Sequence, residues 1–168
     1  MQLVEIDAER YRKRLTKIIF ASIAMLTIGS LSLSQLLIYL VPSTQGTHFH
    51  WNLTGFIITV ILVSKILLRL KSHDYFYEAA YVWDLKKILN KINRRMTKIE
   101  KSAFDGDKTA MQILHYSYTG SRQLWELDNN TLTISHLTQL ENKLHTLAET
   151  HQVTLDTHHF NPQKMENY

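Results

Sequence analysis

His48 and His50 are separated by one residue, and this spacing could present two imidazole ligands for zinc or copper on an extended loop. A structural zinc site needs about four ligands, and the loop before them offers no acid or thiol to complete one. We therefore expect the two histidines to be interfacial polar residues that help to cap an apolar segment beginning at Phe49. His158 and His159 are a weaker pair, because adjacent side chains point apart. We predict no metal and no cofactor.

Lys65 lies inside a strongly apolar segment, and a buried positive charge costs about 2.5–3.5 kcal/mol at the centre of a bilayer. It could be a pathway or pairing residue of a channel, or a lysine that snorkels to the headgroups. We favour snorkelling, because Lys65 shares a helical face with Arg69 and lies close to the end of the segment at Leu70. Gln35 and neighbouring serines make part of the other apolar segment polar. They could pack within the chain or dock another membrane protein.

Two further groups of candidate contact residues lie in the second half of the chain. Arg122, Trp125 and Glu126 could form a buried polar contact or an interaction hot spot, and both alternatives stay open. Leucines at steps of three, four and three residues have the spacing of a short coiled-coil seam. These leucines are Leu137, Leu140, Leu144 and Leu147. We favour covering of this seam within the chain, because it is short for an independent coiled coil.

Catalytic motifs are missing from the sequence. It has no P-loop, no G-x-G-x-x-G, no H-E-x-x-H and no G-x-S-x-G. The chain also has no cysteine, which excludes disulfides, thiolate metal sites and cysteine nucleophiles. We predict that the protein is not an enzyme.

Two long apolar runs, Ile18–Val41 and Phe49–Leu70, dominate the first half of the chain. The first contains no Asp, Glu, Lys or Arg, and each exceeds the roughly 20 residues that cross a bilayer core. A signal peptide has a shorter apolar core and a small-residue cleavage site, which this sequence does not offer. In a chain of 168 residues, a soluble fold would have almost nothing to bury so apolar a hairpin in. The runs predict a two-helix transmembrane hairpin.

The charges beside the two runs predict the orientation. Residues 1–73 contain eight Lys or Arg against three Asp or Glu, and the loop between the runs contains none of these four. Basic residues near spans stay on the cytoplasmic side, so we expect both termini to be cytoplasmic and 44–47 to lie outside. Trp51 and Tyr39 fall at the expected outer interface, where amphipathic rings are favoured.

The remaining residues have the periodicity of helices. An apolar stripe predicts a helix over 74–101, whose opposite surface is basic. The stripe consists of Tyr81, Leu85, Ile88, Leu89, Ile92, Met96 and Ile99. That basic surface consists of Lys86, Lys87, Lys91, Arg94, Arg95 and Lys98. Anionic lipid would suit it, although a solvated surface is the simpler explanation, and we expect no specific nucleic-acid binding. The stretch Phe104-Asp105-Gly106-Asp107 should end this helix. A second helix should follow from the N-cap Asp107, with Gly120 at a kink or a close crossing, and a third should begin near Thr133 or Ser135.

The predicted fold class is therefore all-α: a transmembrane hairpin followed by a cytoplasmic domain of three helices. We expect a basic cytoplasmic segment over 1–17, and the hairpin over 18–72 with spans of about 18–41 and 49–70 and a short periplasmic loop at 42–48. The cytoplasmic domain should cover 73–168. Its end, from Asp156 on, is polar and contains Pro162, which predicts a loosely docked tail.

Three stretches resemble a bacterial family of small two-span inner-membrane proteins, the domain of unknown function 3087. They are Met1-Gln2-Leu3-Val4-Glu5-Ile6-Asp7, Phe49-His50-Trp51-Asn52-Leu53 and Gly120-Ser121-Arg122-Gln123-Leu124-Trp125-Glu126-Leu127-Asp128. The resemblance extends over nearly the whole chain. It implies an inner-membrane location in a Gram-negative bacterium and brings no assigned activity, cofactor or catalytic residue.

Together these patterns predict a small inner-membrane accessory or scaffold protein that acts through contacts of its spans and cytoplasmic helices. Its expected partners are the lipid bilayer and another membrane protein or further copies of itself. The alternative is a subunit of an oligomeric channel or transporter. A conduction path should place charged residues within both spans, whereas Lys65 is the one such candidate and lies near the end of its run.

Overall fold

The computed structural model describes residues 1–41, 48–130 and 134–168, and all regular secondary structure in these ranges is helical. This confirms the all-α prediction, with two long apolar helices followed by further helices. The chain divides into two compact units. The hairpin unit is Lys13–Ala80, and the helical unit joins Met1–Arg12 to Tyr81–Tyr168.

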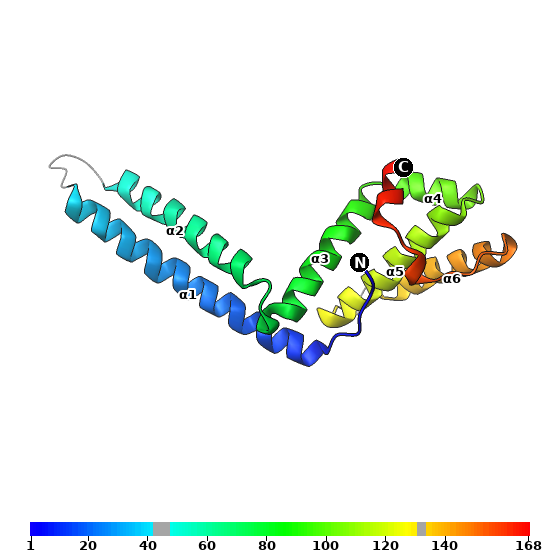
Figure 1. Cartoon of the computed structure of the whole chain (residues 1–168), viewed down its shortest axis with the longest axis horizontal. Coiled ribbons are helices and arrows are strands. Elements are labelled where there is room, and N and C mark those ends of the chain that lie inside the picture. The colour runs from blue at the N-terminus through cyan, green and yellow to red at the C-terminus, as the bar shows by residue number, and fades with distance from the viewer. Residues whose placement is uncertain (42–47, 131–133) are drawn as a thin grey trace. The chain divides into compact units, whose positions relative to one another are not determined.

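The hairpin unit contains two helices, α1 (Ala8–Leu40) and α2 (Phe49–Leu70), that run side by side in Figure 1. The bounds of α2 are those of the predicted second span. The first helix begins at Ala8, well before the predicted span, because the polar residues ahead of Ile18 continue the same helix. Both helices are long and apolar enough to span a membrane. The predicted loop 42–48 lies outside the described residues except for His48.

Small residues hold α1 and α2 close together. Ser34 and Thr59 are each only 4% exposed, and the Ser34 hydroxyl donates to the Asn52 carbonyl at 3.3 Å. Gly55 lies directly against the backbone of Ser34, and Gly29 lies against Thr59. These contacts support the packing alternative for the polar portion of α1. Large apolar side chains, such as Phe20 and Ile28, point away and are mostly exposed.

An ion pair joins α1 to the segment that follows α2. The short 3-10 helix η1 (Asp74–Phe76) leads into α3 (Tyr77–Asn93). An Arg14 guanidinium nitrogen lies 2.7 Å from an oxygen of Glu78, whose side chain is almost fully buried. The guanidinium also lies over the ring of Tyr75, 5.1 Å from its centroid. Nothing in the sequence pattern indicated this contact, because its partners are more than sixty residues apart.

The core of the helical unit lies between α3, α4 (Met96–Phe104), α5 (Lys108–Leu127) and α6 (Ile134–Thr150). Leu85, Ile92 and Ile99 of the predicted stripe are all 0% exposed. Tyr116 of α5 is also 0% exposed, and burial raises the pKa of its phenol to about 12. The aliphatic stripe and the α5 aromatics therefore form one core, as the 3.6-residue period required.

The single helix predicted over 74–101 is wrong, because α3 ends at Asn93 and α4 begins at Met96. Arg95, with φ −117° and ψ 6°, interrupts the helical geometry between them. No glycine or proline at the bend predicts it from the sequence. With the bend in place, Ile92 on one side and Ile99 on the other are both fully buried.

The next turn follows its sequence signals. Gly106 has a φ of +95°, a conformation that favours glycine, and an Asp107 carboxylate oxygen accepts from the backbone N–H of Thr109 and Ala110. This confirms the predicted break and N-cap. Gly120 marks a close crossing, with Leu85 and Leu89 of α3 against it. The last long helix starts at Ile134, and the alternative start Thr133 lies outside the described residues.

The tail beyond Asp156 is packed, which corrects the expectation of a loose end. It forms two 3-10 helices, η2 (Thr157–His159) and η3 (Pro162–Asn167). Phe160 stacks on Tyr116 with ring centroids 3.8 Å apart, and Met165 is 0% exposed. Tyr168 donates its hydroxyl to Asp107 at 2.6 Å. Apolar residues spaced through a polar segment were enough to dock it.

The N-terminal residues also pack into the helical unit instead of forming a separate segment over 1–17. The Val4 N–H donates to the Tyr81 hydroxyl at 2.9 Å, and the Gln123 amide donates to the Val4 carbonyl at 2.5 Å. Tyr11 is 2% exposed and donates to Asp128 at 3.3 Å. The helical unit is therefore discontinuous, and it does not begin at the predicted residue 73.

Candidate functional site

The predicted contact residues fall into an exposed group and a packed group. Gln35 on α1 and Lys65 on α2 are exposed within the hairpin unit. Trp125 on α5 is half-buried, and Glu126 beside it is exposed. The sequence offered these side chains as separate candidates, and each is described here within its own unit.

Arg122 joins α5 to α6. Its Nε donates to Glu141 at 3.1 Å, its Nη2 donates to the other Glu141 oxygen, and Nη2 also donates to the Thr138 hydroxyl at 2.9 Å. This fork-shaped geometry is the strongest that an arginine makes with a carboxylate. Of the two predictions for Arg122, the polar contact within the chain describes this arrangement.

The leucine seam of α6 is only half covered by its own chain. Leu137 and Leu144 are buried at 3% and 4% exposure, whereas Leu140 and Leu147 are half-buried. The buried pair packs within the helical unit, and the other pair forms one wall of a cavity. Leu144 also reaches this cavity, so it contributes to both the core and the cavity wall.

This cavity, which we call the Phe104 groove, has a volume of about 210 Å³. It is lined by Glu100 and Phe104 of α4, Leu114 and Tyr118 of α5, and Leu140, Lys143, Leu144 and Leu147 of α6. Small-molecule pockets usually enclose roughly 300–1,000 Å³, so this groove suits one or two side chains better than a cofactor.

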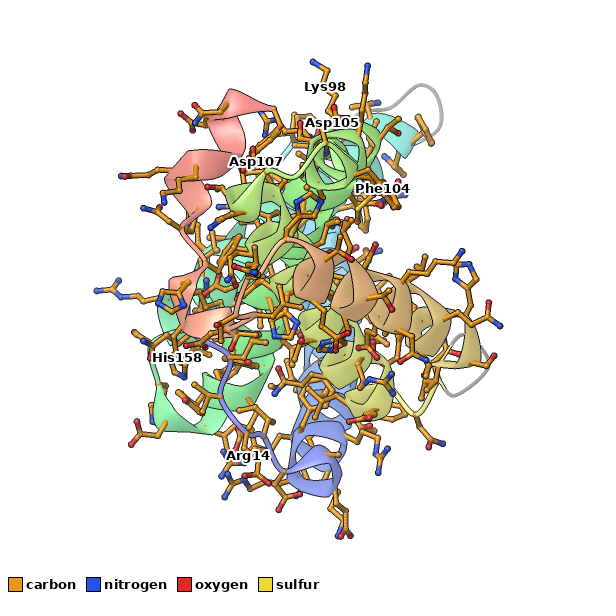
Figure 2. The ribbon with its side chains drawn as sticks, turned by 90° about the vertical axis from the view of Figure 1, so that its right-hand side faces the viewer. Arg14, Lys98, Phe104, Asp105, Asp107 and His158 are labelled. Carbon is orange, nitrogen blue, oxygen red and sulfur yellow. The ribbon has the colours of Figure 1, made fainter. Side chains whose placement is uncertain are left out.

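Phe104 gives the groove the character of a contact site. It lies at the end of α4, beside the turn that contains Asp105, as Figure 2 shows. Its ring is 65% exposed although the groove next to it is apolar. An exposed aromatic residue beside an apolar hollow, with Glu100 and Lys143 at its rim, has the anatomy of a protein–protein hot spot. Sequence inspection missed Phe104, which was assigned to a helix break, because only the fold places it beside the leucines.

The histidine candidates do not form a metal centre. His48 is the N-cap residue of α2, but its side chain makes no capping hydrogen bond. The rings of His50 and Trp51 lie 5.0 Å apart. Near the other end, His159 lies 3.6 Å from Asp156. No group of three or more potential metal-ligating side chains occurs among residues 1–41, 48–130 and 134–168.

The fold and the groove define a class of protein: an all-helical chain in which an apolar two-helix hairpin is attached to a discontinuous helical unit. The chain belongs to the family described as "Protein of unknown function (DUF3087)", whose model matches residues 1–165. This confirms the resemblance seen in the sequence. Comparison with curated proteins and with solved structures gave no match.

Proposed function

We propose that this protein crosses a bilayer twice with α1 and α2 and acts as an accessory or scaffold protein, through protein–protein contacts of its helical unit. The proposal includes no catalytic step. It places the protein in a bacterial inner membrane with both termini in the cytoplasm, on the basis of the charges that flank the two helices.

One observation supports the two-span topology independently of charge. The chain leaves the helical unit at Arg12, forms the hairpin unit, and returns to the helical unit at Tyr81. A compact unit lies on one side of a membrane, so the segment between these two points must cross an even number of times. Only 6% of the most apolar window of α1 and 17% of that of α2 are buried, whereas a soluble core helix would be mostly buried.

The Phe104 groove supports the contact function. The large ring of Phe104 is costly to leave in water. A partner side chain that fills the groove would cover this ring together with Leu140 and Leu147, and would gain about 25 cal/mol for each Å² of apolar surface removed from water. The polar rim would orient the partner. A second copy of this chain and a different membrane protein both fit this description, and the contact is the same in either case.

Topology can be tested by cysteine labelling, because the chain has no cysteine of its own. Single cysteines replace Thr44, between the two helices, and Glu166, in the helical unit. A membrane-impermeant maleimide should label the first in cells with a permeabilised outer membrane, and the second only after the inner membrane is opened. Labelling of both positions without opening, or of the second alone, would contradict the proposed topology.

The contact can be tested by a photo-crosslinking amino acid at Phe104 in the full-length protein in its native membrane. We expect a discrete adduct that is lost when Leu147→Gln makes the groove polar. Thr146→Gln, at the exposed neighbouring position of α6, is the matched control and should leave the adduct intact. Circular dichroism of both variants checks their folding. No adduct from Phe104, or an adduct insensitive to Leu147→Gln, would refute the groove as the contact site.

A further inference from the structure

One surface, formed by α3 and the turn that follows it, is strongly basic and has no role in the proposed contact. This surface, the basic face, is Trp83, Lys86, Lys87, Asn90, Lys91, Arg94 and Arg95, and these residues line one open hollow of about 1060 Å³. Between residues 85 and 99 the sequence has six Lys or Arg and no Asp or Glu. The positive charge is therefore concentrated in α3, the turn after it and the start of α4, although the helical unit as a whole is balanced.

Two acidic side chains neutralise the edges of the basic face and leave its middle positive. Lys86 lies 3.0 Å from Asp128, and Lys91 lies 3.4 Å from Glu166. Lys87 and Arg94 are exposed, and within the described part of the chain neither they nor Arg95 form an ion pair. Three cations at one surface with no acidic partner there are suited to an anionic ligand.

Trp83 indicates which kind of anionic ligand this surface takes. Trp83 is 68% exposed and lies on the same stripe of α3 as Lys87 and Asn90, at steps of four and three residues, and Arg94 follows in the turn after the helix. The opposite stripe, which includes Val82 and Leu85, is buried in the core of the helical unit. An indole with basic neighbours is typical of residues at the headgroup level of a bilayer, where an apolar ring and a polar N–H are both satisfied.

The length of chain after α2 keeps this face near the membrane if the proposed topology holds. Only residues 71–76 separate the end of α2 at Leu70 from the start of α3 at Tyr77, and six residues extend at most about 20 Å. Trp83 follows six residues into the helix, a further rise of about 9 Å. Trp83 is therefore tethered within about 29 Å of the end of α2, which allows it to contact the headgroups that surround α2.

We propose that the basic face binds the surface of an anionic bilayer, with Trp83 in the headgroup layer and Lys87, Arg94 and Arg95 against lipid phosphates. The inference rests on the proposed two-span topology, which tethers the face to the membrane and raises its effective concentration there. The lipid class is defined by charge: phosphatidylglycerol or another anionic phospholipid. Nucleic acid also presents phosphates, but it lacks this tether.

The test uses the full-length protein in nanodiscs, with Trp51→Phe and Trp125→Phe so that Trp83 is the remaining tryptophan. Discs contain either phosphatidylcholine alone or phosphatidylcholine with phosphatidylglycerol, each with a quencher attached at headgroup depth. We expect a blue shift and quenching of Trp83 in the anionic discs only. Both should fade as salt shortens the Debye length from about 10 Å at 0.1 M to about 3 Å at 1 M.

A charge-matched pair of variants tests whether the face itself is responsible. Lys87→Gln, Arg94→Gln and Arg95→Gln together should weaken the quenched state roughly five-fold for each charge removed. The control set removes three positive charges elsewhere in the helical unit, and it should leave quenching nearly unchanged. It consists of Lys101→Gln, Lys108→Gln and Lys164→Gln, all at exposed positions.

The remaining outcomes contradict the inference in different ways. Equal quenching in both kinds of disc, or an equal loss with both variant sets, would show that the basic face does not recognise lipid charge. A Trp83 signal that responds to added RNA but not to anionic lipid would assign the face to nucleic acid. Each of these results leaves insertion of the hairpin into the discs unaffected, so it is distinguishable from failure of the two-span topology.

Discussion

Gly55→Ala should separate α1 from α2, because Gly55 touches the backbone of the opposite helix. A Cβ at this position would lie 2.9 Å from the Ser34 nitrogen and 3.0 Å from its Cα, and would also collide with the hydroxyl. Favourable contacts between carbon atoms need about 3.5–4.0 Å, so the helices must move apart by about 0.5–1 Å. Neither backbone atom can rotate away, in contrast to the end of a side chain.

The expected cost is the difference between two effects. Overpacking typically costs about 1–3 kcal/mol, and a clash with backbone should lie at the upper end of that range. Replacing a glycine inside a helix by alanine returns about 1 kcal/mol. We therefore expect Gly55→Ala to destabilise the hairpin unit by about 2 kcal/mol, visible as a lower thermal unfolding midpoint in detergent.

A disulfide between the two helices reports on the separation directly. A Cβ built at Gly29 lies 3.9 Å from the Thr59 Cβ, within the roughly 3.5–4.5 Å that a disulfide requires. Gly29→Cys with Thr59→Cys should oxidise readily in this cysteine-free chain, and adding Gly55→Ala should slow oxidation several-fold.

The control is Gly120→Ala, whose Cβ meets the side-chain ends of Leu85 and Leu89 at 3.2 and 3.3 Å and that of Leu3 at 3.7 Å. It should leave oxidation of the Gly29/Thr59 cysteine pair unchanged. If Gly55→Ala oxidises as fast as its parent and unfolds no earlier, close contact between the helices is not what holds the hairpin together.

Three further perturbations test other contacts of the fold, each by thermal unfolding of the full chain in detergent. Met165→Ala should lower the free energy of unfolding by about 2–5 kcal/mol because this side chain is fully buried. An unchanged unfolding midpoint would show that the tail is loose instead of docked. Arg14→Gln removes the guanidinium from buried Glu78. Breaking a fully buried ion pair costs about 3–5 kcal/mol, but Arg14 is 30% exposed, so we expect about 2 kcal/mol, with no comparable loss for Arg12→Gln at an exposed position. Burial lowers the pKa of His115 below its usual value of about 6.5, so the unfolded chain binds more protons and stability is lost as the pH falls below that value. His115→Gln should reduce that acid-side loss, and an identical pH profile would refute the assignment.

The sequence predicted those features that depend on local composition and period. The second apolar helix has its predicted bounds, and Asp107 caps α5 as expected, because hydrophobic length and cap chemistry act within one segment. The aliphatic stripe also marked the core correctly at Leu85 and Ile99. Each of these predictions needs only neighbouring residues, and therefore no knowledge of the rest of the fold.

The candidate site was predicted only in part. The leucine spacing identified the correct face of α6, but the separation into buried Leu137 and groove-lining Leu140 depends on what α4 and α5 leave uncovered. Phe104 lines this groove because the bend at Arg95, which the sequence did not predict, starts a new helix that ends beside α6. Side chains from three helices form the groove, and no single periodic pattern contains them all.

The sequence by itself determined that the chain is all-helical and begins with two helices long and apolar enough to cross a membrane, because hydrophobicity and helical period belong to continuous segments. Tertiary structure alone decided that residues 1–12 complete the unit formed by 81–168, through contacts such as Tyr11 with Asp128. It also decided that the polar tail docks through Met165. These contacts join residues distant in the chain, and their free energy comes from surfaces that exist only after the helices have packed.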